Sequence, residues 1–292
     1  MARYDSVRTE EAEAHESLRV GIVQANVGAN LKRQATNGHG RARIDSIAAY
    51  RRGTERAARE GAELIVWPES AITDAIPMGD ASQTNHYLAG KGYGFLNEVG
   101  RDHALLIGLY EGITGRADVV TGKPLRSRYN VAALRQPGDA SAPWTKYRKV
   151  FLIPFGETMP LGLPDDYLPQ NFKMLAGEMP QPMLETRGLK LAPFLCYEGI
   201  LADHVRAVAA AERPDVLVSL TNDSWFGDTW EPHQHLNFTR FRAVEQRVPM
   251  VRSTNTGISA FVSATGDVEA RLGVGAQGAL VREVPLVERE PT

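Results

Sequence analysis

The sequence predicts an α/β layered domain, and three observations lead to this prediction. Short apolar, β-rich runs alternate with longer segments of helical pattern along the chain. Several of the apolar runs are continuous, as in strands that are buried on both faces of a sheet. Neither a change in composition nor a Gly/Ser linker divides the 292 residues, and no internal repeat is evident. We therefore expect a single domain at residues 18–292, preceded by a polar tail at residues 1–17.

Eight strands and four helices are expected in chain order. The strands, which follow the apolar and β-branched runs, are Leu18–Gln24, Glu63–Trp67, Ala104–Tyr110, Tyr129–Leu134, Leu189–Cys196, Asp215–Thr221, Pro249–Thr254 and Ile258–Ala264. The helices are Arg41–Glu60, Thr84–Asp102, Ile200–Glu212 and Pro232–Arg247. In the last helix Leu236, Phe241 and Val244 fall near helical spacing. Pro232 suits the first turn, where its missing N–H has no partner to lose.

Two stretches between these elements, Thr73–Gly94 and Thr158–Gln181, are long for plain loops. The second carries apolar side chains among several prolines, namely Met159, Leu161, Leu163, Tyr167, Leu168, Phe172, Met174 and Leu175. Long ordered loops are often lids or binding loops, so this segment is a candidate lid. The alternative is that its apolar residues simply pack onto the core.

Composition and charge exclude several classes of protein. With 43% hydrophobic and 23% charged residues, the chain is neither disordered nor collagen-like. The net charge of −2, with basic residues scattered among acidic ones, predicts no nucleic-acid partner. No apolar run approaches the roughly 18 to 20 residues of a membrane span. Met1–Ser17 lacks the basic and apolar regions of a signal peptide, so the chain, taken as complete, is expected to stay in the cytoplasm.

Cys196 is the single cysteine, so internal disulfides and a cysteine-based zinc site are excluded. It ends an apolar run and is followed by Tyr197, Glu198 and an expected helix. That junction lies at the carboxyl edge of a sheet, where α/β sites collect, and near a helix N-terminus, which favours a thiolate. Cys196 is therefore either an inert core residue or a nucleophile.

Glu69 and Lys149 occupy comparable places in the sequence. Glu69 follows the expected strand Glu63–Trp67, and Lys149 precedes an apolar run that would be unusual in a surface loop. Taken singly, they could be a solvated glutamate and a lysine whose stem covers apolar surface. Together with Cys196 they supply the base, the electrophile and the nucleophile that acyl transfer needs.

The contexts of these three residues carry a family resemblance. Trp67-Pro68-Glu69, Tyr147-Arg148-Lys149 and Cys196-Tyr197-Glu198 occur in the order of the three signatures of the nitrilase (carbon-nitrogen hydrolase) superfamily, which the chain resembles. Further blocks resemble one branch of it, the catalytic domain of apolipoprotein N-acyltransferases. These blocks are Val66–Ala71, Phe151–Glu157, Thr221–Asp228, Pro232–Leu236 and Arg252–Gly257. The likeness runs from about Leu18 to Leu272.

The resemblance implies a four-layer α-β-β-α sandwich and a Glu69, Lys149 and Cys196 triad that forms a thioester on the cysteine. Glu69 would act as the base, while Lys149 and the backbone N–H of Tyr197 would hold the oxyanion. The implied supporting residues are Glu157, which would orient Lys149 or an incoming amine, and Tyr197, Glu198, Trp225 and Phe226, which would shape the pocket. No cofactor is implied. His233 and His235 have no cysteine or acidic partner at metal spacing in the sequence, so no metal site is expected.

Three functions remain open at this point. The first is an N-acyltransferase that moves an acyl group from phospholipid to the N-terminal amine of a lipoprotein, which the Trp225 and His233 blocks favour. The second is a soluble amidase or nitrilase-type hydrolase of a small carboxamide, which the absence of the branch's membrane helices favours. The third is a catalytically silent binding module, against which the intact triad counts.

The two enzymatic alternatives differ in their expected location and partners. An excised acyltransferase domain would belong to the periplasmic face of the inner membrane and contact that membrane peripherally. Related soluble enzymes assemble into oligomers, whereas the membrane acyltransferases resemble monomers, so the resemblance leaves the oligomeric state open.

Overall fold

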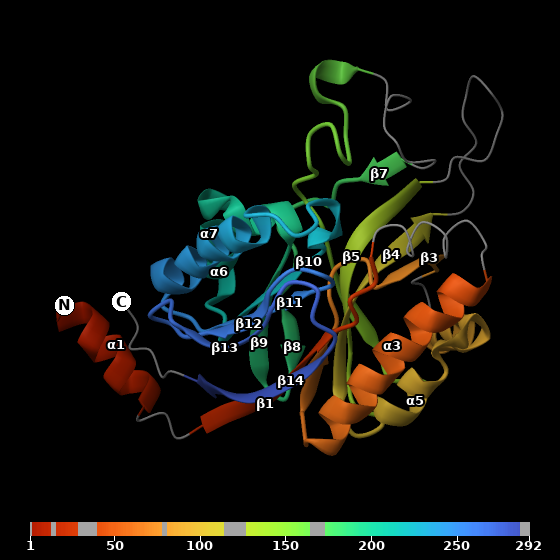
Figure 1. Cartoon of the computed structure of the whole chain (residues 1–292), viewed down its shortest axis with the longest axis horizontal. Helices are drawn as coiled ribbons and strands as arrows, with labels where there is room; N and C mark the ends of the chain where they lie inside the picture. Colours follow the sequence, from red (N-terminus) through yellow and green to blue (C-terminus); the bar gives the residue numbers. More distant parts are fainter. Residues whose placement is uncertain are drawn as a thin grey trace.

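The computed structural model describes residues 2–12, 16–28, 40–77, 81–113, 127–163 and 173–286. Within them, two sheets lie face to face with helices on both outer sides (Figure 1). The first sheet has the order β14-β1-β2-β4-β5-β6, with β3 paired to β4 and β7 to β5, and the second has the order β13-β12-β11-β10-β9-β8.

The strands of the first sheet are β1 (Glu16–Gln24), β2 (Leu64–Val66), β3 (Ile72–Ile76), β4 (Ala104–Ile113), β5 (Ser127–Arg135), β6 (Trp144–Arg148), β7 (Lys173–Leu175) and β14 (Gly278–Leu286). Those of the second are β8 (Leu184–Thr186), β9 (Leu189–Leu195), β10 (Val216–Thr221), β11 (Met250–Thr254), β12 (Ser259–Val262) and β13 (Val268–Leu272). The α-helices are α1 (Ala2–Ala12), α3 (Gly40–Arg59), α4 (Ala81–Leu88), α5 (Phe95–Val99), α6 (Ala202–Glu212) and α7 (Glu231–Gln246). Shorter helices are η1 (Ala89–Tyr93), η2 (Pro160–Gly162), η4 (Cys196–Ile200) and η5 (Asp223–Trp225).

The continuous apolar runs are explained by strands that are buried on both faces. In β2, Leu64 and Val66 join the core between the sheets, whereas Ile65 joins the core under α3 and α5. In β10, Val218 lies in the core between the sheets and Leu217 in the core under α6 and α7. Side chains alternate between the faces of a strand, so each run serves two cores. The resulting layers, helix, sheet, sheet and helix, are the expected four-layer sandwich.

Each of the eight predicted strands coincides with an observed strand, and three of the four predicted helices coincide with α3, α6 and α7. The fourth, Thr84–Asp102, is divided into α4, η1 and α5, because Gly92 interrupts it with a φ of 94°. The stretch Thr73–Gly94, predicted as a long loop, contains the end of β3, α4 and η1.

The N-terminal segment, expected as a polar tail, contains a helix and the start of a strand. Residues 2–12 form α1, and β1 begins at Glu16. Tyr4 donates a hydrogen bond to Asp267 at 2.6 Å, and Val7 is buried, so α1 docks on the turn between β12 and β13. Such contacts join residues far apart in the sequence, which a local pattern does not reveal.

Candidate active site

The three candidate catalytic residues come directly after three strands. Glu69 follows β2, Lys149 is the first residue after β6, and Cys196 is the first after β9. Strand β2 runs parallel to β4. Strand β6 runs in the same direction, because β5 is antiparallel to both β4 and β6. In the second sheet, β9 runs parallel to β10. The carboxyl ends of β2 and β6 therefore point to one edge of the first sheet, as the sequence predicted for an α/β site.

Packing under β2 fixes the approach of Glu69. Trp67 stacks on Tyr50 with ring centroids 4.5 Å apart and donates its indole N–H to Thr54 Oγ1 at 2.9 Å. On the neighbouring strand, a Cβ added to Gly108 would lie 2.2 Å from the carbonyl oxygen of Pro68. Glycine is thus required at this position of β4 for the chain before Glu69 to pass so close.

Lys149 bridges two carboxylates in the interior. Its Nζ lies 3.2 Å from Glu69 Oε1 and 2.8 Å from Glu157 Oε2, and the lysine itself is fully buried. Glu157 also accepts the N–H of Ile153 at 2.9 Å. The structure thus brings Glu157 to Lys149, the contact that the sequence resemblance implied.

Burial by itself lowers the pKa of Lys149, but the charges of Glu69 and Glu157, together with Cys196, outweigh it and raise the pKa well above its usual value. Lys149 is therefore an ammonium ion across the physiological pH range. A fixed positive charge in a dry environment is suited to stabilising a developing oxyanion.

Asn130 on β5 was not identified from the sequence. Its Nδ2 donates to Glu69 Oε1 at 2.7 Å, and its backbone oxygen accepts the N–H of Lys149 at 2.8 Å. Both Asn130 and Lys149 use Oε1 of Glu69, so among the described residues no hydrogen bond occupies Oε2. The only available signal was a polar residue inside the apolar run Tyr129–Leu134.

Cys196 has an uncommon backbone conformation. Its φ is 48°, in the left-handed region, and only 8% of the residue is exposed. Ser70, directly after Glu69, has the same φ of 48°. Non-glycine residues in this region cost free energy and cluster at functional sites.

The expectation of a stabilised thiolate at Cys196 was wrong. Burial and then the negative charge of Glu69 raise the pKa of the thiol, and the opposing effects of Lys149 and of a hydrogen bond with Thr221 do not compensate. The resting side chain is therefore a neutral thiol. The position of Cys196 at the start of a helix favours ionisation of its thiol, but the loss of solvation on burial has the larger effect on the pKa.

Glu198 does not line the pocket as expected. It is fully buried, and its carboxylate accepts the N–H of Val150 at 2.6 Å, the N–H of Leu195 at 2.8 Å and the hydroxyl of Tyr147 at 3.0 Å. Tyr147 also contacts His204 Nε2 at 2.9 Å. Glu198 thus ties the segment that carries Lys149 to the end of β9, which carries Cys196.

The remaining supporting residues lie at the surface or near it. Tyr197 is partly buried in the first turn of η4, where a helix leaves N–H groups without an acceptor of its own. Trp225 is 76% exposed and Phe226 42% exposed at η5. Two apolar residues of the segment that carries Glu157 are also exposed, Phe155 at 67% and Leu161 at 97%.

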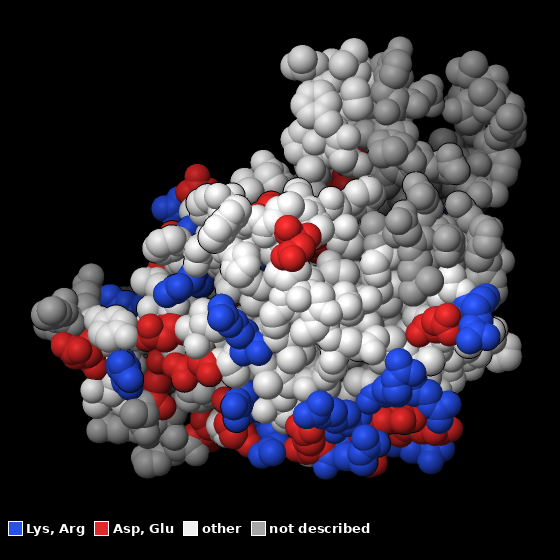
Figure 2. All heavy atoms as spheres, viewed as in Figure 1, with Lys and Arg blue, Asp and Glu red and all other residues white. Residues whose placement is uncertain are grey.

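We call Phe155, Leu161, Trp225 and Phe226 the apolar rim. Phe155 and Leu161 lie two residues before and four residues after Glu157 in the sequence, and Trp225 and Phe226 follow Asp223 by two and three residues. Figure 2 shows charged side chains crowded along the lower edge of the molecule, whereas the described surface at the top, over η2, carries few. Of the candidate lid Thr158–Gln181, Leu161 and Leu163 are exposed, whereas Met174 is buried in β7, which pairs with β5. Tyr167, Leu168 and Phe172 lie outside the described residues.

A second polar cluster lies behind Cys196. His235 Nδ1 is 2.9 Å from Asp223 Oδ1, and Arg252 donates to Asp223 Oδ2 at 3.2 Å. Ligand atoms of Asp223, Glu231 and His235 lie within 4.8 Å of one another, so acidic partners that the sequence spacing did not reveal do surround His235. Protein donors already occupy both oxygens of Asp223, and we assign no metal to the cluster.

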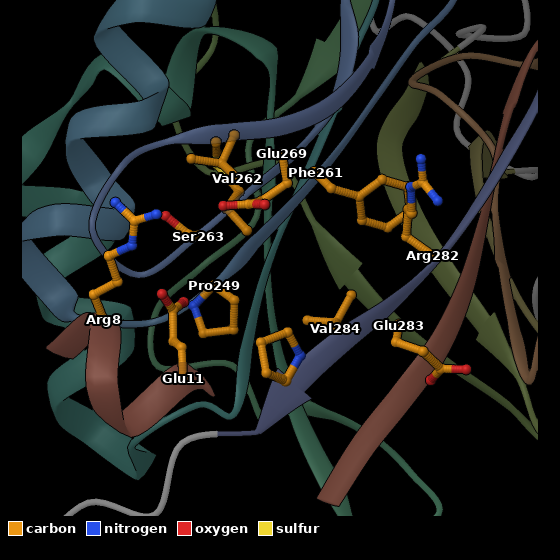
Figure 3. A pocket seen from close by; sticks show the side chains of 12 residues that line it. Arg8, Glu11, Pro249, Phe261, Val262, Ser263, Glu269, Arg282, Glu283 and Val284 are labelled. Atoms are coloured by element: carbon orange, nitrogen blue, oxygen red, sulfur yellow. The ribbon is translucent and has the colours of Figure 1, made fainter. Parts of the chain in front are cut away.

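A pocket of about 540 Å³ lies away from the candidate triad (Figure 3). Arg8 and Glu11 of α1 face Glu269, Arg282 and the strands β12 and β14 across it. Its walls carry both signs of charge and contain no residue of the Glu69, Lys149 and Cys196 group.

Among the described residues, every helix is too short or too polar to span a lipid bilayer.

The four-layer fold and the family match place this chain among the enzymes of the nitrilase superfamily. Residues 19–292 match the carbon-nitrogen hydrolase family, and the chain belongs to it. Among curated relatives, the apolipoprotein N-acyltransferase of Azotobacter vinelandii is 32% identical over 280 residues, which cover 94% of this chain and 49% of the relative. That of Ralstonia nicotianae is 32% identical over 279 residues, covering 91% and 47%. The chain thus spans about half the length of these relatives.

Solved structures agree with the fold. An amidase from Nesterenkonia sp. matches with a TM-score of 0.58 and 23% identity, covering 93% of this chain and 91% of that chain. A carbon-nitrogen hydrolase from Helicobacter pylori matches with a TM-score of 0.59 and 14% identity, covering 93% and 90%. The predicted nitrilase-like sandwich is therefore confirmed.

Proposed function

We propose that this chain is the catalytic part of an N-acyltransferase that carries an acyl group on Cys196, from a phospholipid to the N-terminal amine of a lipoprotein. The observation that supports acyl transfer most strongly is the fully buried Lys149 between Glu69 and Glu157. The charges of Glu69 and Lys149 also act on the Cys196 thiol. A buried ammonium between two carboxylates costs desolvation energy, so it is weak evidence of added stability and marks a candidate functional site.

In the first half-reaction, Cys196 Sγ attacks the ester carbonyl carbon while Glu69 accepts the thiol proton. Lys149 and the N–H of Tyr197 stabilise the oxyanion. When the tetrahedral intermediate collapses, the bond to the lipid alkoxide breaks and Glu69 returns the proton to that oxygen. The product is a thioester on Cys196 and a lysophospholipid.

In the second half-reaction, the acceptor amine attacks the thioester and Glu69 accepts a proton from it. The carbon–sulfur bond breaks, and the proton passes to the departing sulfur of Cys196. Burial and the charge of Glu69 raise the pKa of the thiol, so Glu69 has to take up the thiol proton as the sulfur attacks. Oε2 of Glu69, which no described residue occupies, is the oxygen available for these transfers.

The apolar rim favours a lipid donor over a small amide. Leu161 is 97% and Trp225 76% exposed, and both lie next to segments that hold the site. Exposed apolar groups that gather beside a site indicate contact with an apolar ligand or a lipid surface. The curated relatives named apolipoprotein N-acyltransferase support the same choice.

The test follows the acyl group to its acceptor. The protein is mixed with vesicles of phospholipid labelled in one acyl chain and with a diacylated peptide that has a free N-terminal amine, and the labelled products are separated. We expect acylated peptide that is lost in Cys196→Ala. Release of labelled fatty acid without acylated peptide, or turnover of small carboxamides alone, would instead indicate the amidase.

The apolar rim is tested separately by vesicle co-sedimentation. The double variant Leu161→Ser with Trp225→Ser should bind vesicles more weakly than the wild type. Ile44→Ser is the matched control, because Ile44 is 63% exposed on α3, away from the rim. Equal binding by all three proteins would contradict a role of the rim in lipid contact.

A further inference from the structure

Strand β5 carries an arginine, Arg128, on the same face of the first sheet as the candidate active site. Ala132 and Leu134 of this strand lie in the core between the two sheets. Because side chains alternate between the faces of a strand, Asn130 and Arg128 share that face. Asn130 donates to Glu69 there, so Arg128 continues the wall of the candidate site along β5.

The neighbouring strand leaves room for the Arg128 side chain. The residue opposite Arg128 on β4 is Gly112, and Tyr110, on the same face of β4, is opposite Asn130. Since Gly112 has no side chain, the guanidinium lies over the Tyr110 ring, with Cζ 4.9 Å from the ring centroid. A cation over an aromatic face is attracted to it, so Tyr110 helps to fix the direction in which Arg128 points.

Arg128 and Tyr110 share the electrostatic environment of the candidate catalytic residues. Burial raises the pKa of Tyr110 to about 12, and the charges of Glu69 and Glu157 add to the rise. The positive charge of Arg128 acts in the opposite direction. An arginine does not lose its proton in proteins, so this wall of the site carries a fixed positive charge at every pH of interest.

The wall leads from the dry interior of the site to its opening. Asn130 is 1% exposed, whereas Arg128 is partly exposed at the beginning of β5, where β5 pairs with β7 at the upper edge of the first sheet (Figure 1). At about 3.3 Å per residue, the Cα atoms of these two residues are roughly 7 Å apart. That separation is of the order of the glycerol unit that joins the ester carbonyl of a phospholipid to its phosphate.

The two cations of this wall are available for different tasks. The Lys149 ammonium is fully buried and is held between Glu69 and Glu157. Arg128 instead presents a planar guanidinium nearer to solvent, and parallel N–H groups of a guanidinium match the oxygens of a phosphate.

We propose that Arg128 binds the phosphate of the donor phospholipid and so directs the ester carbonyl to Cys196. The proposal rests on the N-acyltransferase function proposed above, because a phosphate is what distinguishes a phospholipid donor from the small carboxamide of an amidase. In this role Arg128 determines which acyl donor binds, whereas Glu69 and Lys149 act on the reacting atoms.

The test uses ligands that bind without reacting. We measure the protection of Cys196, the single cysteine, against iodoacetamide at alkaline pH by intact mass. The probes are the dihexyl ether analogue of phosphatidylcholine and the dihexyl ether of glycerol, which has the same chains but no phosphate. Their ether bonds cannot acylate Cys196, and both are used below the concentration at which they aggregate. Inorganic phosphate is the third probe, because it distinguishes a lipid headgroup from free phosphate.

In the wild type, the phosphocholine analogue should protect Cys196 at a concentration about tenfold lower than the neutral ether, as expected for hydrogen bonds between charged groups. Inorganic phosphate, which lacks the chains, should not protect at that concentration. Equal protection by the two ethers would overturn the proposal. Protection by inorganic phosphate as strong as that by the phosphocholine analogue would overturn it too, and would indicate a site for free phosphate. This comparison needs no variant to fold.

Arg128→Gln removes the charge and should bring the two ethers to the same protecting concentration, with the neutral ether unchanged. Arg206→Gln is the matched control, because the Arg206 side chain is 71% exposed on α6, and it should keep the wild-type ratio. Equal weakening of both ethers by Arg128→Gln, or an unchanged ratio, would overturn the proposal. None of these measurements involves acyl transfer. Failure of the proposed function would appear separately, as a wild type that forms no acylated peptide in the transfer assay.

Discussion

Glu198→Gln tests whether Glu198 is a buried tie between two site segments. In the wild type, one carboxylate oxygen accepts Tyr147 and the N–H groups of Val150 and Phe151, and the other accepts the N–H of Leu195. A glutamine retains one oxygen and turns an NH₂ group toward the remaining donors. At least one buried donor then loses its acceptor, which costs about 1 to 3 kcal/mol.

The difference in free energy of unfolding between the wild type and Glu198→Gln should also depend on pH. Burial raises the pKa of Glu198 from 4.5 to about 7. Because the folded-state pKa lies above the unfolded one, the stability contributed by the protonated carboxyl is fully present below pH 4.5 and is lost as the pH rises through 7. A shift of this size corresponds to about 3 kcal/mol. Glutamine does not titrate, so the stability advantage of the wild type over Glu198→Gln should shrink by about 3 kcal/mol over this range.

The assay is urea unfolding of both proteins, followed by circular dichroism at a series of pH values. Other titrating groups cancel in the difference between the two free energies of unfolding. The control is Glu185→Gln, which makes the same substitution at an exposed position on β8. If the difference in free energy of unfolding between the wild type and Glu198→Gln did not change with pH, or grew as the pH rose, both the buried tie and the raised pKa of Glu198 would be refuted.

Three further predictions concern the residues around the thiol. Lys149→Ala should lower kcat by roughly 10² to 10³-fold in a steady-state assay, as for a lost oxyanion donor, whereas Lys146→Ala, which removes a partner of Glu111 instead, should stay close to the wild type. A near-normal kcat for Lys149→Ala would remove it from the mechanism. Asn130→Ala should lower kcat more than it changes KM, because Asn130 orients the base at 2.7 Å, and an unchanged kcat would show that this contact is dispensable. Cys196 should alkylate more slowly than a small free thiol near pH 7, because burial raises its pKa; an equal or faster rate by intact mass would contradict this.

The strand ends could be predicted from the sequence because local pattern determines them. Glu69, Lys149 and Cys196 each border an apolar run, and parallel strands place their carboxyl ends together. Six observed strands, β3, β6, β7, β8, β13 and β14, were not predicted. The residues of β13 alternate between intermediate and exposed positions, and only two residues of β14 are buried, so neither strand shows a clear apolar run. Their pairing depends on β12 and β1, which lie next to them only in the folded chain.

The contacts of the site could not be predicted, since they depend on register and burial. Asn130 reaches Glu69 only because β5 pairs with both β4 and β6. Asp223 and His235 lie 12 residues apart and meet where η5 and α7 pack. The sign of the Cys196 pKa shift is set by desolvation, which no local motif encodes.

The central claim is that Cys196 carries the acyl group. The most direct measurement is intact mass followed by peptide mapping, after the protein is mixed with phospholipid and quenched in acid within seconds. We predict a mass increase of one acyl chain on the peptide that contains Cys196, removed by neutral hydroxylamine and absent from Cys196→Ala. Acyl transfer at the wild-type rate by Cys196→Ala, or an adduct on another residue, would contradict the account.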